Sequence, residues 1–196
     1  MTDTSIRLFI ALPLPLGLQR MLSDWSEELR LELPFRKWVH SSDLHITLQF
    51  LGNTPSQQID AITNALRSGI ATSPESFELK LERLRLFGRP DNPSVLWVGI
   101  SGELGPLHAL QQALASVLAP LGYKAEDRPY HPHITLARNY NGNVPFDHGL
   151  LEHFTVPSSA PDGEIPGWSV QDIALYSSSL NQPPPLYTEL QRLPLL

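Results

Sequence analysis

The chain has 196 residues, of which 41% are hydrophobic and 17% are charged, with a formal net charge of −6 and no cysteine. This composition is typical of a globular protein with its own core, and it excludes a disordered or fibrous chain. The lack of cysteine excludes disulfides, thiolate metal sites and cysteine nucleophiles. Because there is no basic excess, we do not expect the protein to coat nucleic acid non-specifically.

No stretch of the sequence predicts contact with a membrane. The apolar stretches fall far short of the roughly 20 residues that span a bilayer. Near the start, Asp3 precedes a short apolar run that Pro13 and Pro15 interrupt, which is not typical of a secretion signal. We therefore expect a cytoplasmic protein without membrane contact, and a monomer as the simplest state.

Hydrophobic periodicity predicts both strands and helices in the first half of the chain. The expected strands are residues 6–12, 35–39, 44–51, 77–87 and 94–100. A helix is expected over residues 16–31, and a second helix carries Ile59, Ile62, Leu66 and Ile70 on one face. Thr54 directly before Pro55 predicts the N-terminal cap of that second helix.

The second half repeats this scheme. A helix is expected over residues 104–118, and strands at 134–136, around 153–156, at 170–176 and at 187–193. Loops are expected at 139–149, at 157–166 and around the three prolines 183–185. Because strands cluster and helices come singly, the fold class is α+β with antiparallel sheets. No long linker separates the halves, so we expect residues 1–196 to form a single bilobal domain.

The tetrapeptide His-Ile-Thr-Leu occurs twice, at residues 45–48 and 133–136. On a strand, side chains two positions apart point to the same side, so each copy presents an imidazole beside a hydroxyl while Ile and Leu face the core. Two such strands facing each other predict a polar cleft between two related lobes. We expect His45, Thr47, His133 and Thr135 to line it.

Two histidines and two hydroxyls suit the opening of a strained phosphodiester. An imidazole has a pKa near 6.5, so one ring can accept a proton from water while the other donates a proton to a departing oxygen. The threonine hydroxyls can bind non-bridging phosphoryl oxygens. The best-matched substrate is a nucleoside 2′,3′-cyclic phosphate, and the scheme requires no metal or cofactor.

These motifs resemble the 2H phosphoesterase superfamily, and within it the RNA 2′,3′-cyclic phosphodiesterase group, also called 2′-5′ RNA ligase or LigT-like. Five segments carry the resemblance in family order: Arg-Leu-Phe-Ile-Ala-Leu at 7–12, Leu-His-Ile-Thr-Leu-Gln-Phe-Leu-Gly at 44–52, Val-Leu-Trp-Val-Gly at 95–99, the stretch 130–138, and Leu-Tyr-Ser-Ser at 175–178. They span most of the chain.

The resemblance implies a bilobal, pseudo-two-fold fold in which two antiparallel sheets line a central cleft with helices outside. It implies hydrolysis of RNA ends or small nucleotides with a 2′,3′-cyclic phosphate to a 2′-phosphomonoester, with reversible 2′-5′ ligation in some members. It assigns His45 as proton donor to the leaving 3′ oxygen and His133 as proton acceptor that activates water. Thr47 and Thr135 would bind phosphate.

Parity on the strand and charge predict the places of other residues in this scheme. Arg138 is a candidate phosphate ligand, although strict alternation puts it on the opposite face from His133. Phe50 has the parity of Ile46 and Leu48, which predicts core packing, whereas Gln49 has the parity of the cleft residues. The cations that could make the cleft basic are Arg36, Lys37, Lys124, Arg128 and Arg138.

Two alternative functions stay open on the sequence. His131, Pro132 and His133 spell His-x-His, so a metallohydrolase could use His131, His133 and His45, although no further ligand has an obvious spacing. His131 could equally orient the cleft or simply pack. A non-catalytic module that binds RNA ends is the second alternative, since phosphate binding does not require turnover.

Overall fold

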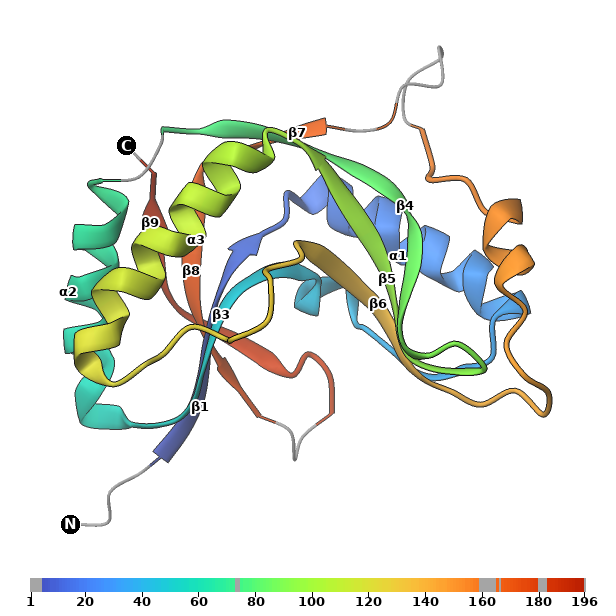
Figure 1. The fold of residues 1–196 in the computed structure, drawn as a ribbon, viewed down its shortest axis with the longest axis horizontal. Coiled ribbons are helices and arrows are strands. Elements are labelled where there is room, and N and C mark those ends of the chain that lie inside the picture. The colour runs from blue at the N-terminus through green and yellow to red at the C-terminus, as the bar shows by residue number, and fades with distance from the viewer. Residues whose placement is uncertain (1–4, 73–74, 159–164, 166, 180–182, 196) are drawn as a thin grey trace.

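The computed structural model describes residues 5–72, 75–158, 165, 167–179 and 183–195 (Figure 1). Nine strands form one antiparallel sheet: β1 (Ser5–Pro13), β2 (Phe35–Trp38), β3 (His45–Pro55), β4 (Phe77–Arg89), β5 (Asn92–Gly102), β6 (His133–Tyr140), β7 (Gly167–Val170), β8 (Asp172–Ser178) and β9 (Tyr187–Pro194). The helices are α1 (Leu16–Glu32), α2 (Ile59–Ile70) and α3 (Leu104–Leu118). Short 3-10 turns lie at Ser41–Asp43, Ser56–Gln58, Ala119–Leu121 and His148–His153.

The sheet consists of two lobes that meet at the repeated tetrapeptides. Its strand order is β7-β4-β5-β6-β3-β1-β8-β9, with β2 paired to the end of β6. Within the described residues, β3 and β6 pair at one position, Ile46 with Ile134. Each of these isoleucines lies between the histidine and the threonine of its own repeat. The two expected sheets are therefore joined into one, and the α+β fold class is confirmed.

The helices are divided between the two ends of the sheet. Figure 1 shows α2 and α3 together beside β8 and β9, and α1 towards the opposite end. Helix α1 buries Leu22, Trp25 and Leu29, which recur at spacings of three and four as the periodicity predicts. Helices α2 and α3 pack closely, because a Cβ atom at Gly69 would lie 3.0 Å from a methyl of Val117. No helix among the described residues is both long and apolar enough to cross a membrane.

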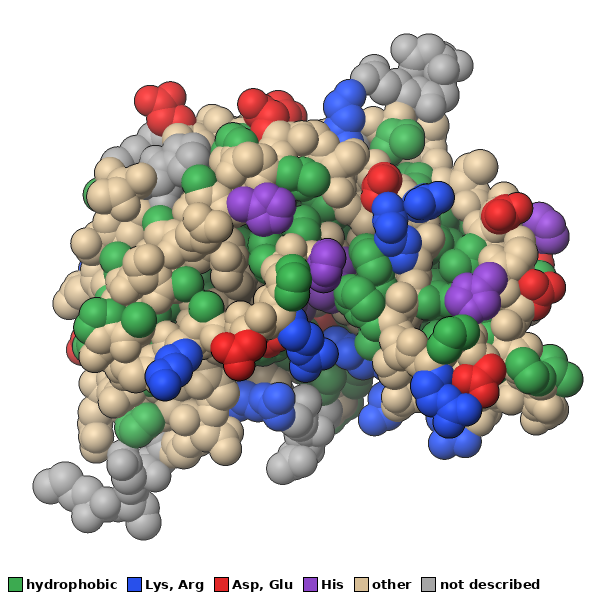
Figure 2. All heavy atoms as spheres, in the orientation of Figure 1, with side chains coloured by type: hydrophobic (Ala, Val, Ile, Leu, Met, Phe, Trp, Pro, Cys, Tyr) green, Lys and Arg blue, Asp and Glu red, His purple; other side chains and the backbone are tan. Residues whose placement is uncertain are grey.

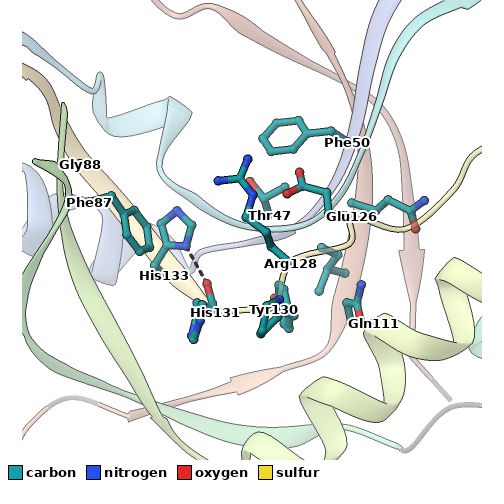
Figure 3. A pocket seen from close by; sticks show the side chains of 13 residues that line it. Thr47, Phe50, Phe87, Gly88, Gln111, Glu126, Arg128, Tyr130, His131 and His133 are labelled. Carbon is teal, nitrogen blue, oxygen red and sulfur yellow. Dashed lines mark hydrogen bonds between the residues drawn. The ribbon is translucent and has the colours of Figure 1, made fainter.

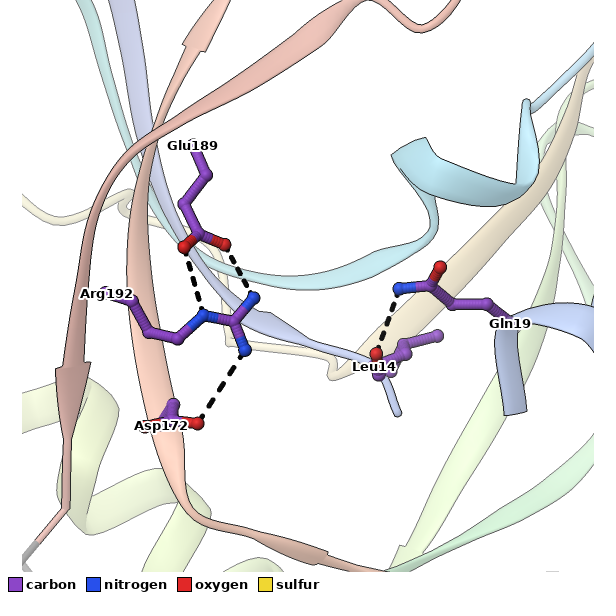
Figure 4. Close-up of polar contacts among 5 residues, drawn as sticks. All are labelled: Leu14, Gln19, Asp172, Glu189 and Arg192. Carbon is purple, nitrogen blue, oxygen red and sulfur yellow. Dashed lines mark hydrogen bonds and ion pairs between the residues drawn. The ribbon is translucent and has the colours of Figure 1, made fainter. Parts of the chain in front are cut away.

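Polar contacts stabilise the lobe that contains β1, β8 and β9 (Figure 4). On β9, Arg192 donates two hydrogen bonds to the Glu189 carboxylate at 3.0 and 2.6 Å, and it lies 3.7 Å from the carboxylate of Asp172 on β8. The Gln19 amide donates to the Leu14 carbonyl at 2.9 Å, which ties the start of α1 to the end of β1. Of these contacts, the one between Arg192 and Asp172 joins two strands, β9 and β8.

Both repeat strands contain a β-bulge at the same place. On β3, Thr47 pairs with Ala11 and Gln49 with Ile10, so Leu48 has no partner on β1. On β6, Thr135 pairs with Trp97 and Ala137 with Leu96, so Leu136 likewise has none on β5. A bulge reverses the alternation of the residues that follow it. Beyond the bulges, Gln49 and Ala137 are buried, whereas Phe50 and Arg138 are exposed.

Three local predictions differ from the structure. Thr54 is not a helix cap: β3 continues to Pro55, α2 begins at Ile59, and the buried Thr54 hydroxyl donates to the Gly52 carbonyl. The strand expected around 153–156 is wrong, because a 3-10 turn occupies His148–His153 and no strand follows it before residue 158. The strand expected at 170–176 is mostly β8, but its first residue is the last residue of β7, which lies on the other lobe. Most of the loop expected at 157–166 lies outside the described residues.

Candidate active site

The two repeats meet in a cleft of about 530 Å³. The structure brings together there all five residues expected from the sequence: His45, Thr47, His133, Thr135 and Arg138. Further side chains in the lining are those of Arg7, Phe9, Asp43, Phe50, Phe87, Arg128 and Tyr187. In Figure 2 a histidine lies at the bottom of a hollow with Lys or Arg side chains beside it. The cleft combines titratable rings, hydroxyls and guanidinium groups.

Both catalytic candidates are oriented by a backbone carbonyl two residues upstream. Nδ1 of His45 lies 2.7 Å from the Asp43 carbonyl, and Nδ1 of His133 lies 2.7 Å from the His131 carbonyl. Because a carbonyl only accepts, each Nδ1 carries the hydrogen, and in the neutral ring Nε2 is the basic nitrogen. The Thr47 hydroxyl lies 3.0 Å from Nε2 of His45. The matched tautomers leave both Nε2 atoms able to exchange a proton with a substrate.

The surroundings of both rings favour their neutral forms. Burial lowers the pKa of His45 to about 4, with smaller lowering effects from the positive charges of His133 and Arg138. Burial also lowers the pKa of His133, helped by the charges of Arg138 and His131. The carbonyl contacts of the two Nδ1 atoms act in the opposite direction. A phosphate entering the cleft would counter the desolvation and the repulsion, and would favour a proton on one ring.

Aromatic side chains surround each histidine and restrict its rotation. The Phe9 and Tyr187 rings lie 4.9 and 5.3 Å from the His45 ring, measured between centroids. On the other lobe, the Phe87 and Trp97 rings lie 5.0 and 5.4 Å from the His133 ring, with interplanar angles of 86° and 61°. These contacts explain why burial dominates both pKa shifts.

Three arginines supply positive charge to the cleft. The guanidinium groups of Arg7, Arg128 and Arg138 line it, and within the described residues none of them has a hydrogen-bond or ion-pair partner. Unpaired guanidinium groups in a protein with a net charge of −6 indicate a site for an anion such as phosphate. The cleft is therefore locally basic although the whole chain is acidic.

The basic residues of the cleft are only partly those expected. Arg128 and Arg138 lie there, whereas Arg36, Lys37 and Lys124 are not in the lining, and Arg36 donates instead to Asn141 at 2.8 Å. Sequence reasoning missed Arg7. Its position depends on β1 lying between β3 and β8, a long-range pairing for which the local pattern around Arg7 gives no signal.

Asp43 joins the first repeat to the segment between β8 and β9. Its buried carboxylate accepts hydrogen bonds from the backbone N–H groups of Leu186 at 2.8 Å and Tyr187 at 3.1 Å. Its own carbonyl orients His45. One residue therefore positions both the imidazole and the Tyr187 ring that packs against it.

His131 contributes its carbonyl to the site, while its side chain is exposed and does not line the cleft. Among the residues that the structure describes, no group of three or more His, Asp or Glu side chains is arranged to hold a metal ion. The ligand set of the metallohydrolase alternative is therefore not assembled in the described part of the chain.

The position of Phe50 differs from the core packing that its parity predicts. Phe50 is 52% exposed and lines the cleft, because the bulge at Leu48 turns it to the side of His45 and Thr47. The equivalent bulge turns Arg138 to the side of His133, which resolves its apparently wrong parity. Gln49, expected in the cleft, is 5% exposed and lines a neighbouring pocket instead.

Comparison with known proteins identifies the family. The model of the 2′-5′ RNA ligase superfamily matches residues 18–181. RNA 2′,3′-cyclic phosphodiesterase of Bacillus subtilis is 32% identical over 80% of this chain and 89% of the relative. The protein of the same name from Geobacillus stearothermophilus is 33% identical over 96% of this chain, which spans 57% of that relative's length.

A solved structure agrees with this assignment. The crystal structure of Escherichia coli LigT complexed with 3′-AMP superposes with a TM-score of 0.75 at 27% identity, covering 98% of this chain and 99% of LigT. The LigT-like fold expected from the sequence is thus confirmed, and the expected class of enzyme is that of the named relatives. The chain belongs to the 2′-5′ RNA ligase superfamily.

Proposed function

We propose that the protein hydrolyses RNA or nucleoside 2′,3′-cyclic phosphates to 2′-phosphomonoesters by metal-independent catalysis with two histidines. The observation that carries this proposal is the matched pair of imidazoles. Each has Nδ1 fixed by a backbone carbonyl at 2.7 Å, and both line one cleft with three unpaired guanidinium groups. The names of the relatives support the substrate class.

In this mechanism the cyclic phosphate lies between the two lobes. Arg7, Arg128 and Arg138 neutralise its charge, and the hydroxyls of Thr47 and Thr135 bind its non-bridging oxygens. His133 accepts a proton from water at Nε2 as the water oxygen bonds to phosphorus. The bond from phosphorus to the 3′ oxygen breaks, and His45 donates a proton to that oxygen through its own Nε2.

The assignment of acid and base follows the resemblance, because the two repeats are locally identical. The charge of the bound phosphate supplies the reason why a proton can reside on His45 in the complex although its pKa is about 4 in the free protein. We also propose that the same site joins a 5′-hydroxyl to the cyclic phosphate, which is reversible 2′-5′ ligation.

The monomer expected from the sequence stays a prediction. The cytoplasmic location expected from the sequence stays a prediction.

The decisive experiment compares His45→Ala and His133→Ala with the wild type on a 2′,3′-cyclic-phosphate oligonucleotide. Each variant should lose about 10²–10⁴-fold in kcat, the usual contribution of general acid–base catalysis. Binding of the 2′-phosphate product should persist, because the arginines are intact. His153→Ala is the matched control, since His153 is exposed and lies outside the cleft.

Other outcomes would overturn the proposal. Wild-type turnover in both variants would show that the histidines are not catalytic. Loss of activity with EDTA that zinc or manganese restores would favour the metallohydrolase. Tight binding of the cyclic phosphate without any turnover by the wild type would favour a non-catalytic module that binds RNA ends.

A further inference from the structure

Two tyrosines from β8 and β9 pack around His45, and only one of them lines the cleft. The ring of Tyr187, at the start of β9, lies 5.3 Å from the His45 ring between centroids, at an interplanar angle of 81°. The ring of Tyr176, on β8, lies 6.3 Å from the same ring. Both tyrosine rings also contact Phe9. Tyr187 belongs to the lining of the cleft and Tyr176 does not, although they share these neighbours.

The two hydroxyls differ in their partners. Burial, together with the charge and the hydrogen bond of the Glu189 carboxylate, raises the pKa of Tyr176 to about 12. The hydroxyl of Tyr187 has no hydrogen-bond partner among the residues that the structure describes. A phenol can donate one hydrogen bond and accept others, so the Tyr187 hydroxyl is available to a ligand in the cleft.

The surroundings of the Tyr187 hydroxyl suit an anion. Burial raises the pKa of Tyr187, whereas the positive charges of Arg138 and Arg7 act in the opposite direction. The phenol therefore lies within the influence of two guanidinium groups that line the same cleft. Because its pKa is raised, it keeps its proton at neutral pH and can donate. A protonated phenol and two guanidinium groups form a set of donors for phosphoryl oxygens.

Tyr187 is held in place before any ligand binds. Its backbone N–H donates to the buried carboxylate of Asp43 at 3.1 Å. Its ring is 4.8 Å from the Phe9 ring, at an interplanar angle of 71°, and the His45 ring packs beside it. A donor that is already positioned needs little reorganisation when charge arrives next to it.

The part of the cleft around His45 lacks a free threonine donor. Because Nδ1 of His45 carries the hydrogen, Nε2 accepts the proton of the Thr47 hydroxyl at 3.0 Å in the free protein. That hydroxyl cannot donate to a phosphoryl oxygen at the same time. No corresponding contact joins Thr135 to His133 within the described part of the chain. A phenol next to His45 supplies the donor that Thr47 does not provide when the substrate enters.

The rings around His133 supply no such donor in the part of the chain that the structure describes. Figure 3 shows Phe87 beside His133, and Trp97 is the second ring that packs on this histidine. Phenylalanine has no polar group, and the indole N–H of Trp97 is buried. Figure 3 also shows Tyr130, whose hydroxyl is likewise buried. An accessible phenol thus distinguishes the surroundings of His45 from those of His133, although the two repeats are identical.

We propose that Tyr187 is a further substrate-binding residue, whose hydroxyl donates a hydrogen bond to a non-bridging oxygen of the cyclic phosphate beside His45. Arg7 and Arg138 bind the same phosphate. The non-bridging oxygen carries negative charge before and during the displacement, so the hydrogen bond stabilises the bound substrate and the transition state alike. This inference rests on the proposed function and adds to it a residue that the repeats do not contain.

The test removes the hydroxyl and keeps the ring. Tyr187→Phe should raise KM for adenosine 2′,3′-cyclic phosphate about tenfold or more and change kcat less than about threefold, because a hydrogen bond to a charged group is lost from both states. The dissociation constant of inorganic phosphate, measured by NMR titration, should rise by a similar factor. Tyr176→Phe is the matched control. It also keeps its ring and loses a hydroxyl, but outside the lining, so all three values should stay within about twofold.

The remaining outcomes are each decisive. Unchanged KM and unchanged phosphate binding in Tyr187→Phe would overturn the inference. A raised KM with unchanged binding of inorganic phosphate would place the hydroxyl against the nucleoside and would also overturn it. A fall in kcat at constant KM would show that Tyr187 acts only through His45, which is a positioning role and not the proposed contact.

Failure of the proposed function gives a different result. A wild type that does not hydrolyse the cyclic phosphate would refute the function, whereas the titration with inorganic phosphate would still compare wild type with Tyr187→Phe. Weaker phosphate binding by the variant would then support the contact of Tyr187 with phosphate, and equal binding would overturn it.

Discussion

Arg138 and Phe50 occupy the same position in the two repeats, five residues after each histidine. Both reach the cleft only because a bulge follows each threonine. The first repeat uses this position for an aromatic face and the second for a positive charge. This difference breaks the symmetry of two otherwise identical motifs at the residue scale.

Arg138 should matter through its charge and through its hydrogen bonds. We expect Arg138→Met to raise KM for a cyclic phosphate by at least about tenfold, since hydrogen bonds to charged groups contribute roughly 1.5–3 kcal/mol. Arg138→Lys should recover part of the loss because it keeps the charge but not the fork of donors. Steady-state kinetics would check this, and an unchanged KM for Arg138→Met would remove Arg138 from the site.

The lowered pKa values of the histidines predict an acidic optimum for the free enzyme. The profile of kcat/KM against pH reports groups of the free enzyme, and activity requires one ring protonated and the other neutral. Both pKa values lie below 6.5, that of His45 at about 4, so the bell should peak below pH 6.5. Activity falls below the lower pKa as the base is protonated, and above the higher pKa as the acid loses its proton.

The positive charge of Arg138 lowers both pKa values, so its removal gives a control for this profile. The bell-shaped profile of kcat/KM against pH should move to higher pH in Arg138→Met, and should stay in place in Arg138→Lys. A profile that is flat from pH 5 to 8, or a wild-type maximum above pH 7, would contradict the scheme.

At the scale of elements, Asp43 links β3 to the segment that leads into β9. Its carboxylate accepts hydrogen bonds from the N–H groups of Leu186, just before β9, and of Tyr187, the first residue of β9. The Tyr187 ring packs on His45. The geometry of the first histidine therefore depends on a strand more than 140 residues away in the sequence.

We expect Asp43→Ala to lower stability by about 1–3 kcal/mol, because two backbone N–H groups lose their buried acceptor. It should also reduce kcat more than it raises KM, since the Asp43 carboxylate no longer holds Tyr187 against the His45 ring. Asp43→Asn retains one acceptor oxygen and should give an intermediate result. Hydrogen exchange at Leu186 and Tyr187 would check the cause: unchanged protection in Asp43→Ala would show that the link is not formed in solution.

The elements that local patterns predict well are those with strong periodicity. Helix α1 and the strands of the two repeats follow from the spacing of apolar residues, and the two histidines and two threonines follow from parity on a strand. The bulges could not be predicted, because they depend on pairing with β1 and β5. Phe50 was therefore wrongly placed in the core, and Arg7 and Tyr187 were missed.

At the scale of the whole molecule, the cleft exists because a five-stranded lobe and a four-stranded lobe join, within the described residues, at one residue pair. Ile46 and Ile134 are fully buried, and each is flanked by the cleft-facing residues of its repeat. The repeat in the sequence thus predicts the position of the junction. The sequence could not predict that the two sheets would join into one, which requires the register between β3 and β6.

The distribution of charge over the molecule predicts how RNA binds. Three arginines serve the cleft of a protein whose net charge is −6, so attraction to phosphate should end where the cleft ends. For single strands the slope of log K against log salt is about −0.7 per neutralised phosphate, so three arginines predict a slope no steeper than about −2. Lengthening an oligonucleotide with a 2′,3′-cyclic phosphate from about 3 to 12 nucleotides should change KM less than about threefold.

Arg7 offers the sharpest check of that distribution, because it lies in the cleft yet touches neither histidine in the proposed mechanism. Arg7→Gln should make the salt slope shallower by about 0.7, whereas Lys37→Gln, outside the cleft, should leave it unchanged. Fluorescence anisotropy with a labelled product oligonucleotide at several salt concentrations measures both. A slope that steepens with oligonucleotide length would show that the RNA follows a longer basic path. The prediction that the protein attracts only the phosphates inside the cleft would then be wrong.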